Sequence, residues 1–566
     1  MNLRIGRKPR TEPQNDTATT ATDVATDTDA PPRWKRLPRP SRLGLVTYLL
    51  AQLVLLFWWM AYYPALFTPD SLNYIAQSTT SNWNTHHPIS YTALVWLSLQ
   101  LTGGVGALTL VHTITMAAGL AYAVTGLRRL GGPGWLWSAV AVVIVALPPV
   151  GTFVMCLWKD VAFVICHMFV IGTMARLVAH RRAGGAPAFP RALVIALLVE
   201  LTLLCLFRQN GFIVVAVTIA LCILLIRGIA LRLIAVGGTA VSIALLTNWM
   251  LLPALGVSKS ESIVAYEAFF SDIAIGYGKA PDSFPESDIA VMTKVAPLTL
   301  WRDSGDCQIV DTTVYSPNFD RLAAYEHKSE LLRIWWDLTR RSPGTILDAR
   351  ICRSALAWQP TSSGVLVRNP TAWGLPIYID RNPLFQQSPF RDAAFSRPIS
   401  QRANTLAVKL NRHTVEPEWL LWRGATWSYV AYVAVGVAAW RRRDRRILAM
   451  ASIIIGNQLS VLAVNNLQAS RYMAAPLVAG ILLTPLLVVR PPKEDDSGPV
   501  AADGVGADRA AVPDQRITDG EAQNEAAAGA GAGADTKVDT KVDTGTDGAV
   551  DQPSTTGTGQ ASGQVG

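Results

Sequence analysis

The stretch LGLVTYLLAQLVLLFWWMAYYPALFTPDS, residues 43–71, decides the fold. Residues 43–63 carry no charged side chain and are long enough to cross a membrane as a helix, which needs about 20 residues. Aromatic residues favour the membrane interface and proline cannot easily continue a helix, so Tyr62-Tyr63-Pro64 marks the end of this helix. We therefore expect a transmembrane helix followed by a loop, which carries Asp70 and then His86-His87-Pro88.

The composition is typical of a membrane protein. Of the 566 residues, 50% are hydrophobic and only 16% are charged. Polar residues dominate 1–42 and 491–566, which we predict to be disordered cytoplasmic tails. The net charge of +9 does not indicate a nucleic-acid partner, because Lys and Arg lie in short clusters between apolar runs, as membrane topology requires.

The basic residues from Trp34 to Arg42 place the N-terminus in the cytoplasm and the loop at 64–88 outside. The next apolar run, 89–101, is short for a span. If it crossed, nearly every basic loop downstream would lie outside, so we predict an interfacial helix on the outer face. The other predicted spans are 105–127, 135–156, 161–179, 192–207, 211–227, 232–254, 419–440, 447–466 and 471–489.

With 43–63 this makes about ten transmembrane helices in an all-α polytopic membrane protein, with both termini cytoplasmic. About seven helices form an N-terminal module, 43–255, and three form a C-terminal module, 419–490. Between them lies a hydrophilic extracytoplasmic insert, 256–418, which is too long for a plain connector and is expected to fold.

Within the insert we predict helices at Glu326–Thr339 and Leu347–Trp358, a loop over 365–398, and a surface segment over 402–422. Cys307 and Cys352 could pair if the insert lies outside the cytoplasm, and the sequence leaves this open. The other four cysteines lie in apolar runs and are expected to be ordinary packing residues.

Ionisable residues gather at the predicted outer ends of the spans. Charges placed there are costly and often functional. Two carboxylates and three cations on one face suit a reaction with a lipid phosphate, because cations hold the phosphate and a carboxylate activates the attacking group. The candidates are Asp70, His86, His87, Lys159, Asp160, Arg208 and Arg471.

Each candidate also has a simpler interpretation. Asp70 in Thr-Pro-Asp-Ser could cap a helix. His86 and His87 could open the interfacial helix, or could bind a divalent metal ion with a carboxylate, although one adjacent His pair is a weak metal signal. The shared face, and not any single residue, carries the prediction.

Lys159 and Asp160 could be a neighbouring ion pair at a helix end, and Arg208 and Arg471 could reach lipid headgroups. The sequence contains no P-loop, no Gly-x-Gly-x-x-Gly after a strand, no His-Glu-x-x-His and no Gly-x-Ser-x-Gly. A nucleotide-driven cytosolic enzyme or a metalloprotease therefore has no support.

This layout resembles the GT-C glycosyltransferases, in particular the protein O-mannosyltransferase and lipid A aminoarabinose-transferase branch, and multi-pass bacterial relatives of that superfamily. The resemblance covers 43–255 well and 445–490 loosely. Many members have a second acidic residue where Ser71 stands, and His-Pro-Pro where this chain has His87-Pro88-Ile89. The matching stretches are Thr68-Pro-Asp-Ser71, His87-Pro88, Arg128-Arg129, Lys159-Asp160 and Arg471-Tyr472 with Pro476.

The resemblance implies a GT-C-like fold and a place in the bacterial plasma membrane. It also implies transfer of a sugar from a polyprenyl-phosphate donor to an envelope glycan, lipid or protein, with inversion at the anomeric carbon. Asp70 would deprotonate the acceptor hydroxyl, and Asp160 would orient the acceptor or a cation. The expected substrate-binding residues are His86, His87, Lys159, Arg208, Arg471 and Tyr472.

Two other classes of function compete with this hypothesis. The chain could be a transporter or flippase for a lipid-linked envelope precursor, although no internal repeat is visible. It could also be a non-catalytic membrane scaffold whose insert binds a partner. An Asp70→Asn variant should inactivate an enzyme and matter little to a scaffold.

Overall fold

The computed structural model describes residues 41–184, 190–260, 263–361, 364, 366–370, 383–391 and 394–490. Within these ranges all regular secondary structure is helical, and β-pairing is limited to isolated bridges. The all-α prediction is therefore confirmed. The predicted tails lie outside the described residues except at 41–42, and so do positions 365, 371–382 and 392–393 of the loop predicted over 365–398.

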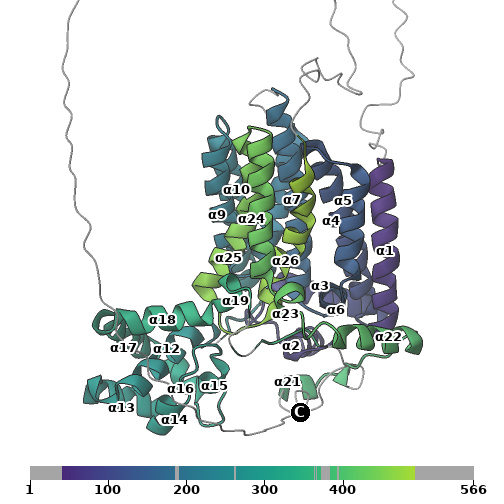
Figure 1. The fold of residues 1–566 in the computed structure, drawn as a ribbon. Coiled ribbons are helices and arrows are strands. Elements are labelled where there is room, and N and C mark those ends of the chain that lie inside the picture. The colour runs from purple at the N-terminus through teal and green to yellow at the C-terminus, as the bar shows by residue number, and fades with distance from the viewer. Residues whose placement is uncertain are drawn as a thin grey trace, which may run out of the picture. The chain divides into compact units, whose positions relative to one another are not determined.

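Six candidate membrane-spanning segments stand out in the described part of the chain by length and apolar composition. Up to seven are present if one bent helix pair is counted as a span. The axes of these helices lie roughly parallel to one another in Figure 1. The first three segments are Arg42–Tyr62 (α1), Gly106–Leu130 (α4, Gly106–Leu127, and η2, Arg128–Leu130) and Lys159–Arg182 (α7). The other three are Ala230–Ala254 (from α10, Ala230–Leu246, through α11, Leu252–Ala254), Arg445–Val464 (η7, Arg445–Ala451, and α25, Ser452–Val464) and Ser470–Val488 (η8, Ser470–Met473; α26, Ala474–Leu483; and η9, Thr484–Val488).

The central helix of this bundle is α7. Its most apolar window is 89% buried against protein, whereas that of α1 is only 22% buried. Ser41 caps the start of helix α1, because its side chain accepts a hydrogen bond from the Gly44 amide, and the helix exposes Leu49 and Leu53. An exposed apolar face suits contact with lipid, while a helix buried all round belongs at the centre.

The span predicted at 135–156 is two helices and not one. Helix α5 (Gly134–Ala146) and helix α6 (Pro148–Met155) meet at an angle of 66°. Pro148 and Pro149 explain the break, because a proline inside a helix removes a backbone donor and clashes with the preceding turn. The bend turns α6 toward the end of the bundle where the candidate residues lie (Figure 1).

Three other predicted spans form helices that are shorter or less apolar than the six. Helix α8 (Arg191–Phe207) has 17 residues and helix α9 (Gly211–Leu225) has 15. The third is α24 (Gly424–Arg441). In the bundle, α24 packs against α26. Helix α9 packs against α25 and α7 packs against α26, so the N-terminal and C-terminal predicted modules share one core.

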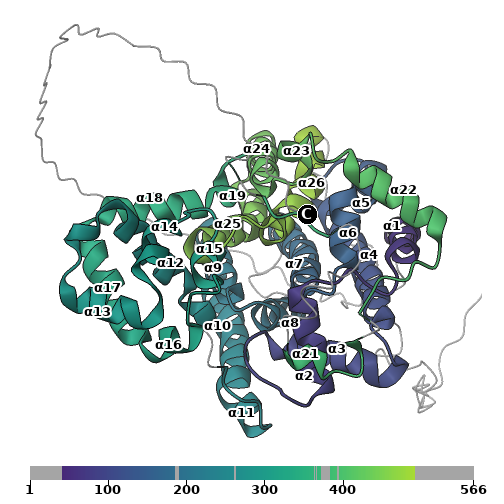
Figure 2. The same ribbon diagram turned by 90° about the horizontal axis from the view of Figure 1, so that it is seen from below.

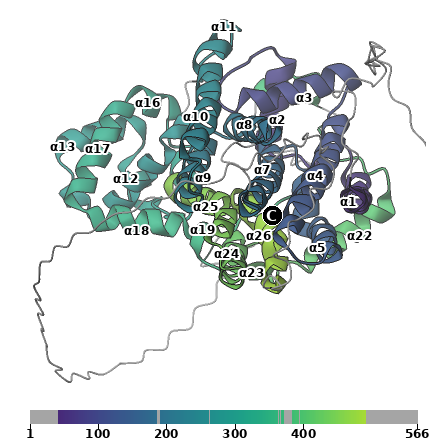
Figure 3. The same ribbon diagram turned by 90° about the horizontal axis from the view of Figure 1, so that it is seen from above.

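The short apolar run predicted to lie at the interface is helix α3 (Ile89–Thr102), 14 residues long. It ends at Gly103, which has φ 66°, a left-handed conformation that glycine adopts without strain. Helix α3 packs against α2 (Pro69–Thr79), and Figure 2 shows both at the same end of the bundle. Figure 3 shows the bundle from its opposite end.

The first part of the insert forms a helical unit with a hydrophobic core of its own, built around Phe270, Trp301 and Leu331. The helix predicted at Glu326–Thr339 is present as α17, and that at 347–358 as α18 and α19. A disulfide bond joins Cys307 and Cys352. The helices are α12 (Glu267–Lys279), α13 (Glu286–Val295), α14 (Leu298–Asp303), α15 (Asp311–Val314), α16 (Arg321–Glu326), α17 (Lys328–Arg341), α18 (Pro343–Arg353) and α19 (Ala355–Trp358).

The last part of the insert returns to the membrane helices. Helix α22 (Gln401–Arg412) lies against α1, where the Asn404 side chain donates a hydrogen bond of 2.9 Å to the Ala61 carbonyl. Short helices α21 (Pro383–Gln386) and α23 (Glu418–Leu421) flank it. The surface segment predicted over 402–422 therefore continues from the end of the first helix to the start of α24.

Candidate functional site

The predicted site residues come from five separate segments and meet at one end of the bundle. This is the end where α2, α3 and α6 lie (Figures 1 and 2). Three contacts link the segments, and they join residues up to 401 positions apart in the chain. The contacts are Asp70 with Arg471, Asp160 with Arg208, and Lys159 with His87.

Asp70 is the second residue of α2 and does not cap it. That role belongs to Thr68 and Ser71, because the Thr68 amide donates to the Ser71 hydroxyl at 3.1 Å. The Trp158 indole donates to the Thr68 hydroxyl at 2.6 Å, and the Ser71 hydroxyl donates to the Leu157 carbonyl at 3.0 Å. The start of α2 is thus fastened to the start of α7, and the Asp70 carboxylate remains available for another partner.

That partner is Arg471. Its Nη1 lies 2.7 Å from Asp70 Oδ2, and the two side chains are 18% and 21% exposed. Burial raises the pKa of the Asp70 carboxyl, but the positive charges of Arg471 and Lys159 and the hydrogen bond from Arg471 outweigh burial and bring that pKa well below its usual range. The Asp70 carboxyl is therefore ionised and partly accessible. It is a weak base as long as it is paired with Arg471.

Asp160 forms the second pair, with Arg208 Nη1 at 2.8 Å. Asp160 is only 1% exposed, and its Oδ2 atom has no hydrogen-bond partner among the described residues. It lies in the first turn of α7, where the helix dipole favours a negative charge. This carboxylate holds Arg208 in place and has less access to a substrate than Asp70 has.

Lys159 has a different environment from the two arginines. In the described ranges no carboxylate oxygen lies within 4.0 Å of its ammonium group, and its recorded partner is His87 Nδ1 at 3.2 Å. Burial and the nearby Lys159 charge lower the pKa of His87 well below its usual value, and lower that of His86 as well. Neutral His87 can therefore accept a hydrogen bond from the Lys159 ammonium.

Aromatic rings orient the two guanidinium groups. The Tyr472 ring centre lies 5.1 Å from the Arg208 guanidinium carbon and 5.3 Å from that of Arg471. The Trp158 ring lies 4.9 Å from the Arg471 guanidinium carbon. Stacking of this kind restricts a long side chain and leaves its N–H groups available at the edges.

The charges of the site do not balance. Lys159, Arg208 and Arg471 carry three positive charges, whereas Asp70 and Asp160 carry two negative charges. A partly buried cation without a carboxylate favours binding of an anion, and Arg and Lys are the residues that bind phosphate. The arrangement is therefore suited to hold an anionic group beside an ionised carboxylate.

Two cavities lie at this end of the bundle, and only the first is lined by predicted site residues. One is polar, with an empty volume of about 310 Å³, and is lined by Arg208, Asn210, Val461, Val464, Asn465, Asn466 and Tyr472. The other is mainly apolar, with an empty volume of about 650 Å³, and is lined by Tyr63, Pro64, Phe67, Ile75, Leu99, Gly103, Gly104, Val105, Gly106, Phe390, Ala394, Phe395 and Arg397. The second cavity has the chemistry to accept a hydrocarbon chain at the membrane surface.

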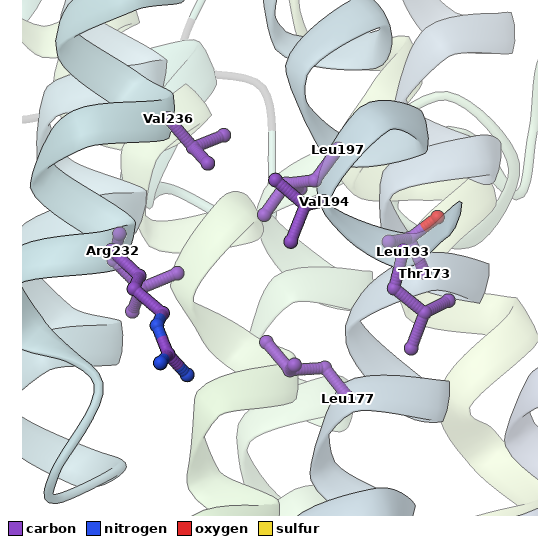
Figure 4. Close-up of a pocket in the computed structure, with 8 residues that line it drawn as sticks. Thr173, Leu177, Leu193, Val194, Leu197, Arg232 and Val236 are labelled. Carbon is purple, nitrogen blue, oxygen red and sulfur yellow. The ribbon is translucent and has the colours of Figure 1, made fainter. Parts of the chain in front are cut away.

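A third cavity lies away from the site. Figure 4 shows it between α7, α8 and α10, lined by Leu197 and other apolar side chains together with Thr173 and Arg232. None of the predicted site residues lines it.

Sequence reasoning missed several residues at the site. Trp158 and Tyr74 are buried, and the Tyr74 hydroxyl has no hydrogen-bond partner in the part of the chain that the structure describes. Trp158 directly precedes Lys159, so its position was the available signal. Asn466 and Gln468 could not be recognised, because nothing in the apolar pattern shows that their loop meets the insert.

Glu200 was also missed. It is 8% exposed within α8 and accepts a hydrogen bond of 2.7 Å from Thr173. The signal was visible, since Glu200 is the only acidic residue in a predicted span, 192–207. A carboxyl group at membrane depth is a functional candidate by default.

The His-His pair receives no support as a metal site. Among the described residues there is no group of three or more His, Cys, Asp or Glu side chains that could hold a metal ion. His87 Nδ1 faces the Lys159 ammonium, and the His86 and His87 rings lie edge to face at 4.6 Å.

The helices and their composition define an all-α protein with candidate membrane spans. A family model described as a family of unknown function, DUF6020, matches residues 73–498, and the chain belongs to this family. The match includes every candidate site residue except Asp70, which lies just before it. No curated protein and no solved structure matches the chain.

Proposed function

We propose that this protein is a membrane glycosyltransferase that transfers a sugar from a polyprenyl-phosphate donor to a hydroxyl group of an envelope glycan, lipid or protein. The observation that carries the proposal is the gathering of Asp70, Arg471 and Lys159 at one end of a bundle of apolar helices. A carboxylate that can take a proton stands there beside cations that can hold a phosphate. The layout also resembles that of GT-C enzymes.

The topology proposed for this reaction places the site outside the cytoplasm. Ten spans result if α8, α9, α24 and the bent pair α5 and α6 cross together with the six longer segments. Arg128, Arg182 and Arg446 are then cytoplasmic, as the positive-inside rule requires. The disulfide bond in the insert supports this orientation, because disulfides persist in oxidising compartments.

The proposed step starts with the donor phosphate. Lys159, which lacks a carboxylate partner in the described ranges, would bind it together with Arg471. A phosphate on Arg471 competes with Asp70 for the guanidinium group, so the pKa of the Asp70 carboxyl rises toward its ordinary value. Donor binding would therefore convert a weak base into a stronger one.

The acceptor hydroxyl then attacks the anomeric carbon of the donor sugar. Its oxygen forms the new glycosidic bond, its proton passes to Asp70, and the bond between the anomeric carbon and the phosphate oxygen breaks. The electron pair of that bond leaves with the polyprenyl phosphate, whose charge Lys159, Arg208 and Arg471 offset. One direct displacement inverts the anomeric configuration, and Asp160, paired with Arg208, would position the cation.

The proposal is tested by incubating membranes that contain the protein with a panel of radiolabelled polyprenyl-phosphate sugars. Label should leave the lipid for an acceptor, and the product should have the inverted anomeric configuration. A product with retained configuration would rule out the single displacement. Membranes that lack the protein serve as the control for endogenous transferases.

One observation favours a second function, a transporter or flippase for a lipid-linked precursor. Glu200 is buried within the bundle, and its Oε2 atom has no hydrogen-bond partner among the described residues. Carboxyl groups in such positions serve proton-coupled transport in other proteins. A Glu200→Gln variant that abolishes lipid flipping in vesicles, while the wild type transfers no sugar, would favour the transporter.

A further inference from the structure

The loop at 465–470 joins α25 to the segment that carries Arg471 and Tyr472. Several of its side chains form hydrogen bonds with residues of the insert. Asn465 donates a hydrogen bond of 2.5 Å to the Arg353 carbonyl. Gln468 donates to the carbonyls of Cys352 and Arg353, each at 3.0 Å.

The backbone of this loop is held from two further directions. The Val310 amide donates to the Asn466 carbonyl at 3.0 Å. The Val367 amide donates to the Gln468 carbonyl at 2.8 Å, and the Ser470 amide donates to the Val367 carbonyl at 3.0 Å. Asn466 also donates from its side chain to Glu267 at the start of α12, at 3.0 Å.

The Cys307–Cys352 disulfide joins the two parts of the insert that hold this loop. Cys352 supplies one of the carbonyl groups that Gln468 binds, and Cys307 lies three residues before Val310. The neighbouring Arg353 is 1% exposed and pairs with buried Asp272 at 2.7 Å, which ties this end of α18 to α12. The insert thus presents a rigid, cross-linked surface to the loop.

We propose that Gln468 and the Cys307–Cys352 disulfide position Arg471 and Tyr472 in the site. Arg471 comes three residues after Gln468, and its ion pair with Asp70 depends on where this loop lies. The insert then contributes to donor binding without touching the donor. This inference rests on the proposed glycosyltransferase function for its kinetic consequence, whereas its structural consequence is independent of that function.

The kinetic test compares Gln468→Ala and Gln468→Glu with wild type. The second substitution keeps the length of the side chain but removes its N–H donors. Both variants should raise the donor KM about tenfold, as expected for loss of a buried hydrogen bond that orients a binding residue, with a smaller change in kcat. The matched control is Asn318→Ala, an exposed residue of the same insert, which should behave as wild type.

The structural test is amide hydrogen exchange over residues 465–473 in the full chain, in detergent. Cys307→Ser/Cys352→Ser, and wild type after reduction, should exchange at least tenfold faster in this segment, while α4 and α7 remain protected. Reoxidation of the wild type should restore protection. A segment merely destabilised by global unfolding would instead exchange together with the bundle.

The two sets of results separate the claims. If wild type transfers no sugar from any donor but exchange over 465–473 responds to reduction, the proposed function fails and the positioning role stands. If wild type transfers sugar, and the Gln468 variants and the reduced protein keep its KM and its exchange pattern, the positioning role is overturned.

Discussion

At the level of single residues, the properties of the site follow from which charged side chains are paired with one another. Asp70 and Arg471 form an accessible pair, Asp160 and Arg208 form a buried one, and Lys159 contacts a neutral histidine. The two aspartates therefore have different capacities. In the proposed reaction, Asp70 exchanges its partner for a substrate, whereas Asp160 holds Arg208.

Removal of the Lys159 charge should weaken donor binding more than the chemical step. Lys159→Ala should raise the donor KM about tenfold, because one phosphate contact is lost, and it should lower kcat less. The measurement is the dependence of the initial transfer rate on donor concentration. Lys279→Ala, at the exposed end of α12, is the matched control, and an unchanged KM for Lys159→Ala would contradict phosphate binding.

Glu267 should make stability depend on pH. Burial raises the pKa of its carboxyl to about 7, despite hydrogen bonds from Tyr315 and Asn466 and the charge of Arg321, and Asp311 raises it further. The pKa of Glu267 is therefore higher in the folded protein than the ordinary value near 4.5 that we expect in the unfolded chain, so protonation of this carboxyl favours the folded state. This contribution to the free energy of unfolding is complete at pH values below about 4.5 and is lost as pH rises through about 7.

A Glu267→Gln variant should therefore show a flatter dependence of its unfolding temperature on pH between 5 and 8, with a gain relative to wild type at pH 8. Thermal unfolding in detergent at both pH values measures this. An equal slope for the two proteins would show that Glu267 does not titrate in that range.

At the level of helices, close packing in the bundle depends on small residues. A Cβ atom added at Gly126 of α4 would lie 2.5 Å from the Gly172 carbonyl oxygen of α7. Backbone atoms cannot move aside as a flexible side chain does, so the two helices would have to separate. The contact between α4 and α7 therefore requires glycine at position 126.

Gly126→Ala should lower the unfolding free energy by about 1–3 kcal/mol, the usual cost of overpacking. Gly238→Ala in α10 is the matched control, because nothing lies within 4 Å of its added Cβ and alanine favours helix. Thermal unfolding in detergent should rank Gly126→Ala below wild type and Gly238→Ala at or above it. The reverse order would contradict the packing described for α4 and α7.

Helix positions were largely predictable from the sequence, since an apolar run flanked by polar residues has few other structures open to it. The 135–156 run was the exception, although Pro148 and Pro149 were visible and account for the break. The shared end of Asp70, Asp160 and Arg471 followed from counting spans. The partner of each side chain could not be predicted in the same way, because an ion pair between residues 401 positions apart depends on how the helices pack.

At the level of the whole molecule, the insert and the membrane helices are joined at the site. The sequence predicts that the insert lies between two sets of spans. It does not show that the insert forms hydrogen bonds with the loop at 465–470 or that Cys307 and Cys352 form a disulfide bond. These contacts join distant segments, and no local pattern specifies them. The N-terminal and C-terminal halves meet there as well, since Arg471 pairs with Asp70.

The most direct test of the central claim is the rate of sugar transfer by Asp70→Asn beside wild type and Asp282→Asn, an exposed aspartate of the insert, at matched expression in membranes. If Asp70 is the base, Asp70→Asn should reduce transfer by about 10²–10⁴-fold, and Asp282→Asn should match wild type. Equal transfer by wild type and Asp70→Asn would contradict the assignment of Asp70 and move the search for the base to Asp160.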